Sequence, residues 1–352
     1  MRLARLLPVI LLAATLPCTT LAQQDDDQDP PKQSAPQTEK TDEQKEIEKF
    51  DKAIKDLPVF EGEFTLYQKK KEVLLAIPEA KLGKLFFAQA TVGMGVGMDG
   101  LQSGDPLNQD FVDTFQFELG SNEDIRLVKP NLKHRWLDDN PLARASQLSF
   151  PNAILANYKI EAKHPTKKLY LINITRFFDG SLFKLQNIVN MTAGMGYSPD
   201  SANSDLLSIK SFPENTVVKY GLHFRKGGFG DDDGGSLLAL LLGLSTVSPL
   251  ADTRSLPLSV VYNLWFDRDT GYQPRLADPR VGYFTTDYFD VGKLKQPLRD
   301  TKLINRFHLT KKNPGLALSE PVKPIVWYLD KTIPAEYKDA VRSGILFWNK
   351  AF

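Results

Sequence analysis

Hydrophobic and polar residues alternate along much of the chain after Pro58, with the period of two that is typical of β-strands. The alternation begins at 60–67, where Glu61, Glu63 and Thr65 separate apolar positions. Segments of this kind clearly outnumber helical ones, which predicts an α+β fold that is predominantly β, with an antiparallel β-rich domain. The predicted strands are 60–67, 73–77, 85–92, 115–119, 125–128, 157–162, 169–175, 216–224, 259–266, 282–286 and 304–309.

Helical spacing of apolar residues is clearest over 41–57. Thr41 can cap the start of this helix, with Gln44 three residues later, and Pro58 ends it. The apolar residues form one stripe on a charged helix, so we expect the stripe to dock on a neighbouring surface. Shorter helical pieces are predicted at 78–81, 142–148 and 182–189, and loops at 198–204 and 227–235.

The last thirty residues differ from the β-rich block at 58–320. Pro324–Asp330 is an apolar run that predicts a buried strand, and Pro334 is placed to open a helix. Apolar side chains on that helix recur at the spacing of a core-facing stripe. They are Tyr337, Val341, Ile345, Trp348 and Phe352. We therefore expect 321–352 to be the beginning of a second domain, whose stripe meets a surface from outside this chain.

The first 22 residues have the features of a signal peptide. They contain two arginines, an apolar run over 6–16, and small residues before a cleavage site between Ala22 and Gln23. This predicts an exported protein, periplasmic or extracellular. Segment 23–40 is acidic, rich in Gln and Pro and almost free of residues to bury, which predicts a disordered linker. The apolar runs at 6–16 and 237–244 are too short for a permanent bilayer span, so we expect no membrane partner after signal removal.

Charge and cysteine content narrow the function classes. Residues 23–56 hold eleven acids and six lysines, a net charge of −5, whereas the whole chain carries a formal charge of +1. The surplus of positive charge beyond residue 56 is mild and has no dense basic stripe, so nucleic acid is not an expected partner. Cys18 is the one cysteine and would leave with the signal peptide. The exported chain would then have neither a disulfide nor a thiol nucleophile.

Candidate chemistry is sparse. Asp231–Asp233 could contribute carboxylates to calcium, but the twelve-residue loop with its closing Glu is missing, so we favour a solvated loop. The glycines at 93–100 do not have the spacing of a nucleotide-binding loop and indicate a turn. The histidines are too far apart in sequence for two of them to share a helix face. They are His134, His164, His223 and His308. We predict no catalytic, cofactor-binding or metal-binding residue in this chain.

Four separated segments carry a family resemblance. They are 73–85 (VLLAIPEAKLGKL), 211–218 (SFPENTVV), 275–284 (RLADPRVGYF) and 323–352. In this order they resemble the N-terminal portion of bacterial secreted zinc-dependent metalloproteases, which carry uncharacterised β-rich regions ahead of a metzincin-like catalytic domain. The resemblance identifies 275–284 as the hallmark segment. Its residues of interest are Arg275, Asp278, Pro279, Arg280, Gly282 and Tyr283.

The resemblance also implies what this chain lacks. The family's catalysis rests on His-Glu-x-x-His followed by Gly-x-x-His, and neither motif occurs in residues 1–352. Zinc is therefore expected in the full-length parent protein, downstream of Phe352, and not in this chain. The expected partner is that downstream catalytic domain, with a peptide substrate as a further possibility. For the hallmark we favour a structural role, in which Asp278 and Arg280 brace a turn as a charge-assisted pair, over a place in a substrate cleft.

Two hypotheses of function follow. In the first, the chain is the non-catalytic scaffold or prodomain portion of a secreted zinc metallopeptidase. In the second, it is a stand-alone exported module that binds a peptide, a glycan or an envelope component. The first is favoured by the hallmark segment and by the unpartnered apolar stripe near the C-terminus.

Overall fold

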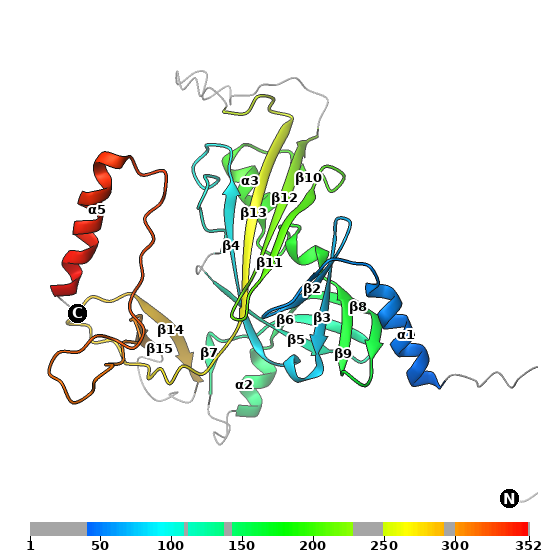
Figure 1. Ribbon diagram of the computed structural model, residues 1–352, viewed down its shortest axis with the longest axis horizontal. Coiled ribbons are helices and arrows are strands. Elements are labelled where there is room, and N and C mark those ends of the chain that lie inside the picture. The colour runs from blue at the N-terminus through cyan, green and yellow to red at the C-terminus, as the bar shows by residue number, and fades with distance from the viewer. Residues whose placement is uncertain (1–40, 109–111, 137–142, 228–248, 292–299, 351–352) are drawn as a thin grey trace, which may run out of the picture. The chain divides into compact units, whose positions relative to one another are not determined.

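The computed structural model describes residues 41–108, 112–136, 143–227, 249–291 and 300–350 (Figure 1). The chain divides into two units, Met1–Thr41 and Asp42–Phe352, and every element below belongs to the second. The predicted signal peptide, its Ala22–Gln23 cleavage site, the linker 23–40, Asp231–Asp233 and the run 237–244 lie outside the described residues.

The elements, in chain order, are α1 (Asp42–Ile54), β1 (Val59–Phe60), β2 (Thr65–Lys69), β3 (Glu72–Pro78), η1 (Glu79–Lys81), β4 (Leu85–Met94), β5 (Asp113–Leu119), β6 (Asp124–Lys129), β7 (His134–Arg135), α2 (Ala143–Ser149), β8 (Ala153–His164), β9 (Leu169–Asn173), η2 (Thr175–Phe178), α3 (Leu185–Thr192), β10 (Tyr197–Pro199), β11 (Asp205–Ser211), β12 (Thr216–Lys226), β13 (Ser255–Phe266), β14 (Thr285–Asp290), β15 (Asp300–Ile304), α5 (Ala335–Phe347) and η4 (Trp348–Lys350). The fold class is α+β and predominantly β, as the alternation predicted. Within the described residues, no helix combines the length and the apolar character that a bilayer span requires.

One large antiparallel sheet organises the domain. Its strands follow the order β1-β2-β3-β9-β8-β6-β5-β4-β13-β12-β10, and β11 also pairs with β12. The longest pairing joins β12 and β13, from Thr216 opposite Leu264 to Arg225 opposite Ser255. The alternation of the sequence sets the two faces: along β4, Phe86, Ala88 and every second residue to Val92 are buried.

The sheet curls until its two ends meet. Side-chain hydrogen bonds and isolated backbone hydrogen bonds join the two ends, and we call this junction the seam. The backbone N–H of Glu63 donates to the Phe212 carbonyl at 2.7 Å, and the Ser211 hydroxyl donates to the Phe64 carbonyl at 2.8 Å. At the other end of β2, Lys71 Nζ donates to the carbonyls of Ala202 and Ser204. The seam shields the edges that a flat sheet would leave open.

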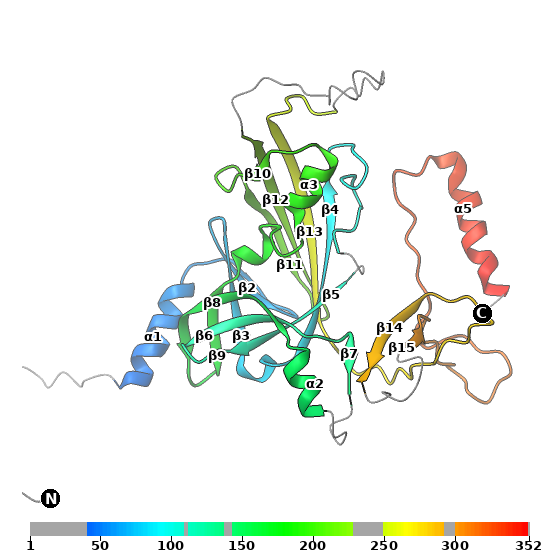
Figure 2. The same cartoon turned by 180° about the vertical axis from the view of Figure 1, so that it is seen from behind.

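Aromatic side chains fill the space inside the curled sheet. Phe86 is 1% exposed and lies at the centre of this core. Five phenyl rings surround it with centroid distances between 4.9 and 6.3 Å. They belong to Phe64, Phe115, Phe117, Phe177 and Phe266. Helix α3, which Figure 2 draws against β12 and β13, contributes Leu185 and Val189 to the same core.

Helix α1 docks on the outer face of the sheet, as its apolar stripe predicted. Phe50 is 1% exposed and packs against Leu74 and Ala76 of β3 and Leu171 of β9. Its ring also meets the His164 ring edge-on at 5.4 Å. β3 is therefore buried on both faces, which explains why its sequence is an almost continuous apolar run.

Three strand predictions near the C-terminus need correction. The strand predicted over 304–309 lies earlier, as β15, and the one predicted over 282–286 lies later, as β14. The apolar run Pro324–Asp330 is not a strand, because no neighbouring strand pairs with it in the described part of the chain. Its side chains are also not buried: Trp327 is 66% and Tyr328 91% exposed. Helix α5 follows Pro334 as predicted.

Three strands were not predicted, namely β7, β10 and β11. β10 takes up the start of the predicted loop 198–204. β11 escapes the period-of-two pattern because its register against β12 shifts between Leu206 and Ser208, a bulge that turns Leu207 outward.

Candidate functional site

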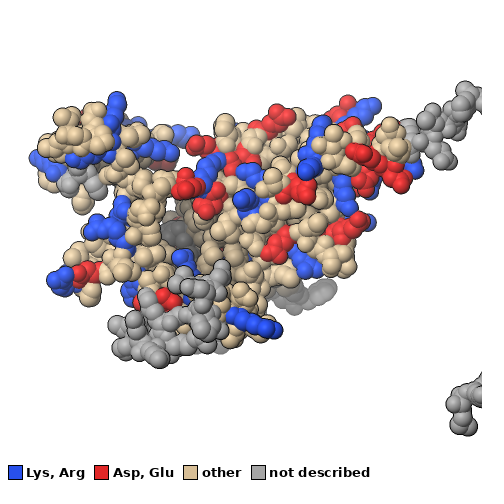
Figure 3. All heavy atoms as spheres, turned by 90° about the horizontal axis from the view of Figure 1, so that it is seen from below, with Lys and Arg blue, Asp and Glu red and all other residues tan. Residues whose placement is uncertain are grey.

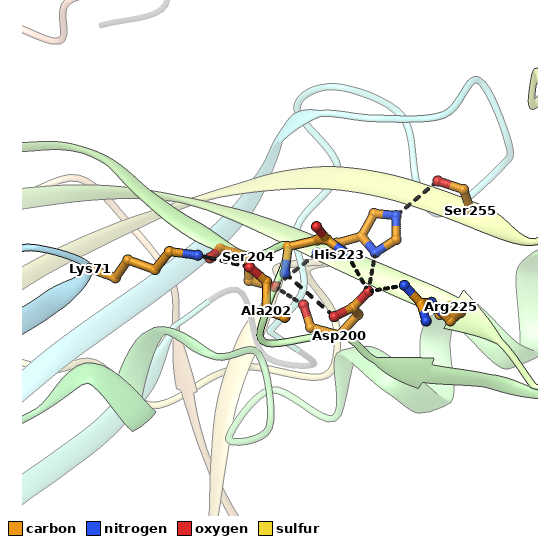
Figure 4. Close-up of polar contacts among 8 residues, drawn as sticks. Lys71, Asp200, Ala202, Ser204, His223, Arg225 and Ser255 are labelled. Carbon is orange, nitrogen blue, oxygen red and sulfur yellow. Dashed lines mark hydrogen bonds and ion pairs between the residues drawn. The ribbon is translucent and has the colours of Figure 1, made fainter.

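A connected polar cluster lies on the outer face of β12 and β13 (Figure 4). His223 is its centre. The Nδ1 atom of His223 lies 3.1 Å from Oδ2 of Asp200, and its Nε2 atom lies 2.8 Å from the Ser255 hydroxyl. The side chains of Asp200 and His223 are only 12% and 17% exposed. We call Asp200, His223 and Ser255 the polar cluster.

The sheet itself brings these residues together. Along β12, Leu222 and Phe224 are buried while His223 and Arg225 lie on the opposite face. Arg225 faces Ser255 across the β12–β13 ladder, which places Ser255 diagonally next to His223. Asp200 follows β10, the strand paired with the end of β12, and its backbone N–H donates to the His223 carbonyl at 2.8 Å.

Asp200 is held ionised by several donors. The pKa of its carboxyl is below the ordinary value, first because the Asn203 amide donates to it, and further because of the Asn203 backbone N–H, the His223 ring and the Arg225 guanidinium. Partial burial of the carboxyl acts against this shift. Nη2 of Arg225 lies 3.3 Å from Oδ2 of Asp200. The carboxylate therefore favours the anionic form over a wide range of pH.

The contacts of the polar cluster resemble those of a catalytic triad, but the residues around it favour a structural role. The order Asp–His–Ser matches the relay in which a histidine takes a proton from a serine hydroxyl. However, the polar cluster also fastens the turn 200–204: Ser204 Oγ donates to the Asp200 carbonyl at 2.8 Å and accepts the His223 N–H at 3.1 Å. Two cavities, one beside α5 and one at the start of β2, are lined by other residues and not by Asp200, His223 or Ser255. We assign the polar cluster a structural role at the seam, where Lys71 binds the same turn.

Replacing Asp200 by asparagine should make the free energy of unfolding depend less on pH in the acid range, below about pH 4. The lowered pKa of Asp200 stabilises the folded chain above the ordinary aspartate value of 3.8, and that contribution is lost as pH falls through the folded-state pKa. Asp200→Asn should therefore be less stable than wild type at neutral pH, and the difference should shrink below about pH 4. Urea unfolding between pH 2.5 and pH 7 measures this, with exposed Asp99→Asn as control. A difference that stays constant with pH would contradict the assignment.

No sequence pattern revealed the polar cluster. Asp200, His223 and Ser255 are far apart in the chain and belong to no short motif. The strand predicted over 216–224 contains His223, and the structure places this residue on the face opposite the buried Leu222 and Phe224. Its neighbours on that face depend on the β12–β13 register and on the unpredicted strand β10, which local patterns do not encode.

The hallmark segment lies beside the small sheet of β7, β14 and β15. The Ala277 N–H donates to the Lys302 carbonyl of β15, and the Arg275 carbonyl accepts the Ile304 N–H. The expected pair between Asp278 and Arg280 is present, with contacts of 2.9 Å from Nε and 2.5 Å from Nη2. The hydrogen bond from Arg280 lowers the pKa of the Asp278 carboxyl, and the pair joins two residues of a single turn. Pro279 and Gly282 are exposed within the same segment, and Tyr283 is 53% exposed.

The histidines are spread over four separate places. His134 stacks on Phe150, His164 meets Phe50, His223 belongs to the polar cluster, and His308 meets the ring of Tyr272. Across the described ranges, no three His, Cys, Asp or Glu side chains are grouped so that they could hold a metal ion.

A family model described as a domain of unknown function, DUF5117, matches residues 108–312, more than half of the chain. The chain belongs to the DUF5117 family. The DUF5117 match includes the polar cluster and the hallmark segment, and it ends before 324–350. No curated protein and no solved structure matches the chain.

Surface charge in this DUF5117 protein is mixed. Figure 3 shows lysine and arginine side chains interspersed with aspartate and glutamate on the face that it draws. Most ion pairs among the described residues are exposed at one or both partners, as between Lys163 and Glu123. Such pairs contribute little to stability. Burial of the aromatic core is the larger stabilising contribution.

Proposed function

We propose that this chain is the non-catalytic scaffold portion of a secreted zinc metallopeptidase, which holds the catalytic domain of the parent protein through residues 324–348. One observation carries the proposal. From Asn305 to Lys350 no residue is buried, yet this stretch contains large apolar side chains. Trp327, Phe347 and Trp348 are 66%, 65% and 63% exposed.

These apolar residues are organised into a groove. The extended segment 324–330 and helix α5 together line a cavity of about 260 Å³. Ile325, Trp327 and Leu329 contribute from the extended segment, and Ile345, Leu346 and Trp348 from the helical side. We call these six residues the docking groove. A contiguous apolar surface of this kind is typical of a protein interface, and tryptophan is prominent among the residues that dominate binding energy.

The catalytic domain is the occupant that we favour because of where the docking groove lies. It falls in the segment 323–352, whose sequence resembles the first strand and helix of a metzincin-like protease domain. A strand of that kind requires a neighbouring strand for its backbone hydrogen bonds, and Pro324–Asp330 has none in the described residues. Docking of further protease residues would satisfy both the backbone and the apolar face of α5. Export and the zinc of the parent protein are part of this same proposal.

Mutation of the docking groove tests the proposal. We expect the chain alone to show no chelator-sensitive cleavage of casein. The reading frame beyond codon 352 should encode His-Glu-x-x-His and Gly-x-x-His, and the polypeptide that it encodes should bind the chain. Trp327→Ser and Trp348→Ser should each weaken that binding about tenfold or more. Binding is measured by calorimetry with both polypeptides purified.

Leu318→Ser is the control, because Leu318 is an apolar residue that is 87% exposed but belongs neither to α5 nor to the docking groove. It should leave the affinity within about twofold of wild type. Zinc-dependent proteolysis by the chain alone, or a reading frame without the zinc motif, would overturn the proposal. Equal losses in the control and in the tryptophan variants would overturn the choice of surface.

A further inference from the structure

A second cavity opens where the curled sheet begins at β2, and its walls are mainly aromatic and aliphatic. It has a volume of about 310 Å³ and lies between the start of β2, the end of β3, β5 and the end of β13. Phe64, Phe117 and Phe266 line it together with Ile77. Cavities of about 150 Å³ with such walls already accept an aromatic ring. We call this cavity the mouth site.

The mouth site carries a cation that no carboxylate neutralises in the described part of the chain. Lys81, held on η1 directly after Pro78, lines the cavity, and its Nζ lies 4.1 Å from the centroid of the Phe266 ring. No ion pair involving Lys81 is present among the described residues. The ammonium is thus positioned over one apolar wall by a cation–π contact and retains its hydrogen-bond donors.

The acidic residue of the mouth site is already engaged. Glu63 is 6% exposed in its side chain and forms an ion pair with Arg268. Its other oxygen accepts the backbone N–H of Phe266 at 3.1 Å. Arg268 and Glu63 compensate each other, so Lys81 leaves the mouth site with one net positive charge. A ligand that is complementary to these walls has an apolar body and one negative charge.

We infer that the mouth site binds an apolar carboxylate, with its hydrocarbon or aromatic part against Phe117 and Phe266 and its carboxylate on Nζ of Lys81. Two sources share this chemistry, namely a peptide C-terminus with an apolar last residue and a free fatty acid. Both bury an apolar group and retain a charge-assisted hydrogen bond at the mouth. The inference is independent of the docking groove, which involves none of these residues.

Calorimetric titration of the full chain with matched acids and amides tests the inference. The probes are N-acetyl-L-phenylalanine and octanoate, each compared with its carboxamide. Both amides have the same apolar body as their acid but no charge. We expect at least one acid to bind saturably and about tenfold more tightly than its amide. Lys81→Gln should reduce the acid's affinity about tenfold and leave the amide's unchanged, whereas Lys81→Arg should retain most of it.

Lys84→Gln is the control, because Lys84 is an exposed lysine three residues away that does not line the mouth site. It should bind the acids as wild type does. Tighter binding of N-acetyl-L-phenylalanine would assign the site to peptide termini, and tighter binding of octanoate would assign it to fatty acids. Either result supports the inference. Absence of saturable binding, amides that bind as well as acids, or an unchanged affinity in Lys81→Gln would overturn it.

Discussion

Replacing Phe86 by alanine is expected to lower the free energy of unfolding by about 3–5 kcal/mol. The side chain is 1% exposed and touches rings from four separate parts of the fold. Its removal loses the transfer free energy of a phenyl group and leaves a cavity that rigid neighbours cannot fill. The nearest ring, that of Phe117, is stacked at 4.9 Å and would lose its main contact.

Phe87→Ala provides the matched control in the same strand. Phe87 points to the opposite face of β4, where it is half-buried and pairs with Trp265 at 5.6 Å. Phe87→Ala should lower the free energy of unfolding less than Phe86→Ala does. The substitution removes a smaller buried area, together with one cross-strand pair that contributes about 1 kcal/mol or less. Urea unfolding followed by tryptophan fluorescence and circular dichroism measures both variants. Equal losses for the two substitutions would show that the interior of the curled sheet is not the dominant core.

Gly62→Ala is expected to cost about 1–3 kcal/mol by disrupting the seam. A methyl group added at Gly62 would lie 2.5 Å from Oγ of Ser211 and 2.6 and 2.7 Å from the backbone O and N of Phe212. The backbone atoms cannot move without breaking the hydrogen bond from Glu63 to Phe212. The sheet should consequently open at this end, and the amide of Glu63 should exchange with solvent faster.

Gly282→Ala is the corresponding control. No atom lies within 4 Å of a methyl group built at Gly282, although this glycine belongs to the hallmark segment. We expect no loss of stability and no change in amide exchange. Hydrogen exchange followed by mass spectrometry distinguishes the two variants. Faster exchange across the whole sheet in Gly62→Ala, without a localised change at 62–64 and 211–216, would contradict a role specific to the seam.

The residues matched by the DUF5117 family model overlap only in part with the residues that line the two cavities. The match shows the family, but its description names no activity. The docking groove lies beyond the matched residues, and the mouth site combines Phe117 within them with Lys81 and Phe64 before them. Both proposed binding surfaces thus include residues outside the family region.

Local sequence patterns determined much of the secondary structure. Strands β3, β4, β12 and β13 follow directly from alternation or apolar runs, and prolines at 58 and 334 bound the helices α1 and α5. The Asp278–Arg280 pair was also predictable, because two residues of opposite charge within one turn can meet whatever the rest of the chain does. These features depend only on neighbours in sequence.

Tertiary structure alone decided which surfaces meet. The seam, the polar cluster and the mouth site each join residues that are separated by many positions, and their contacts depend on strand order and register. β11 was hidden because its bulge breaks the period of two. The apolar run Pro324–Asp330 looked like a buried strand, but burial and pairing require a partner that a one-dimensional pattern cannot supply. The sequence therefore determined the elements and the side of each that is apolar, while long-range pairing determined what each apolar side covers.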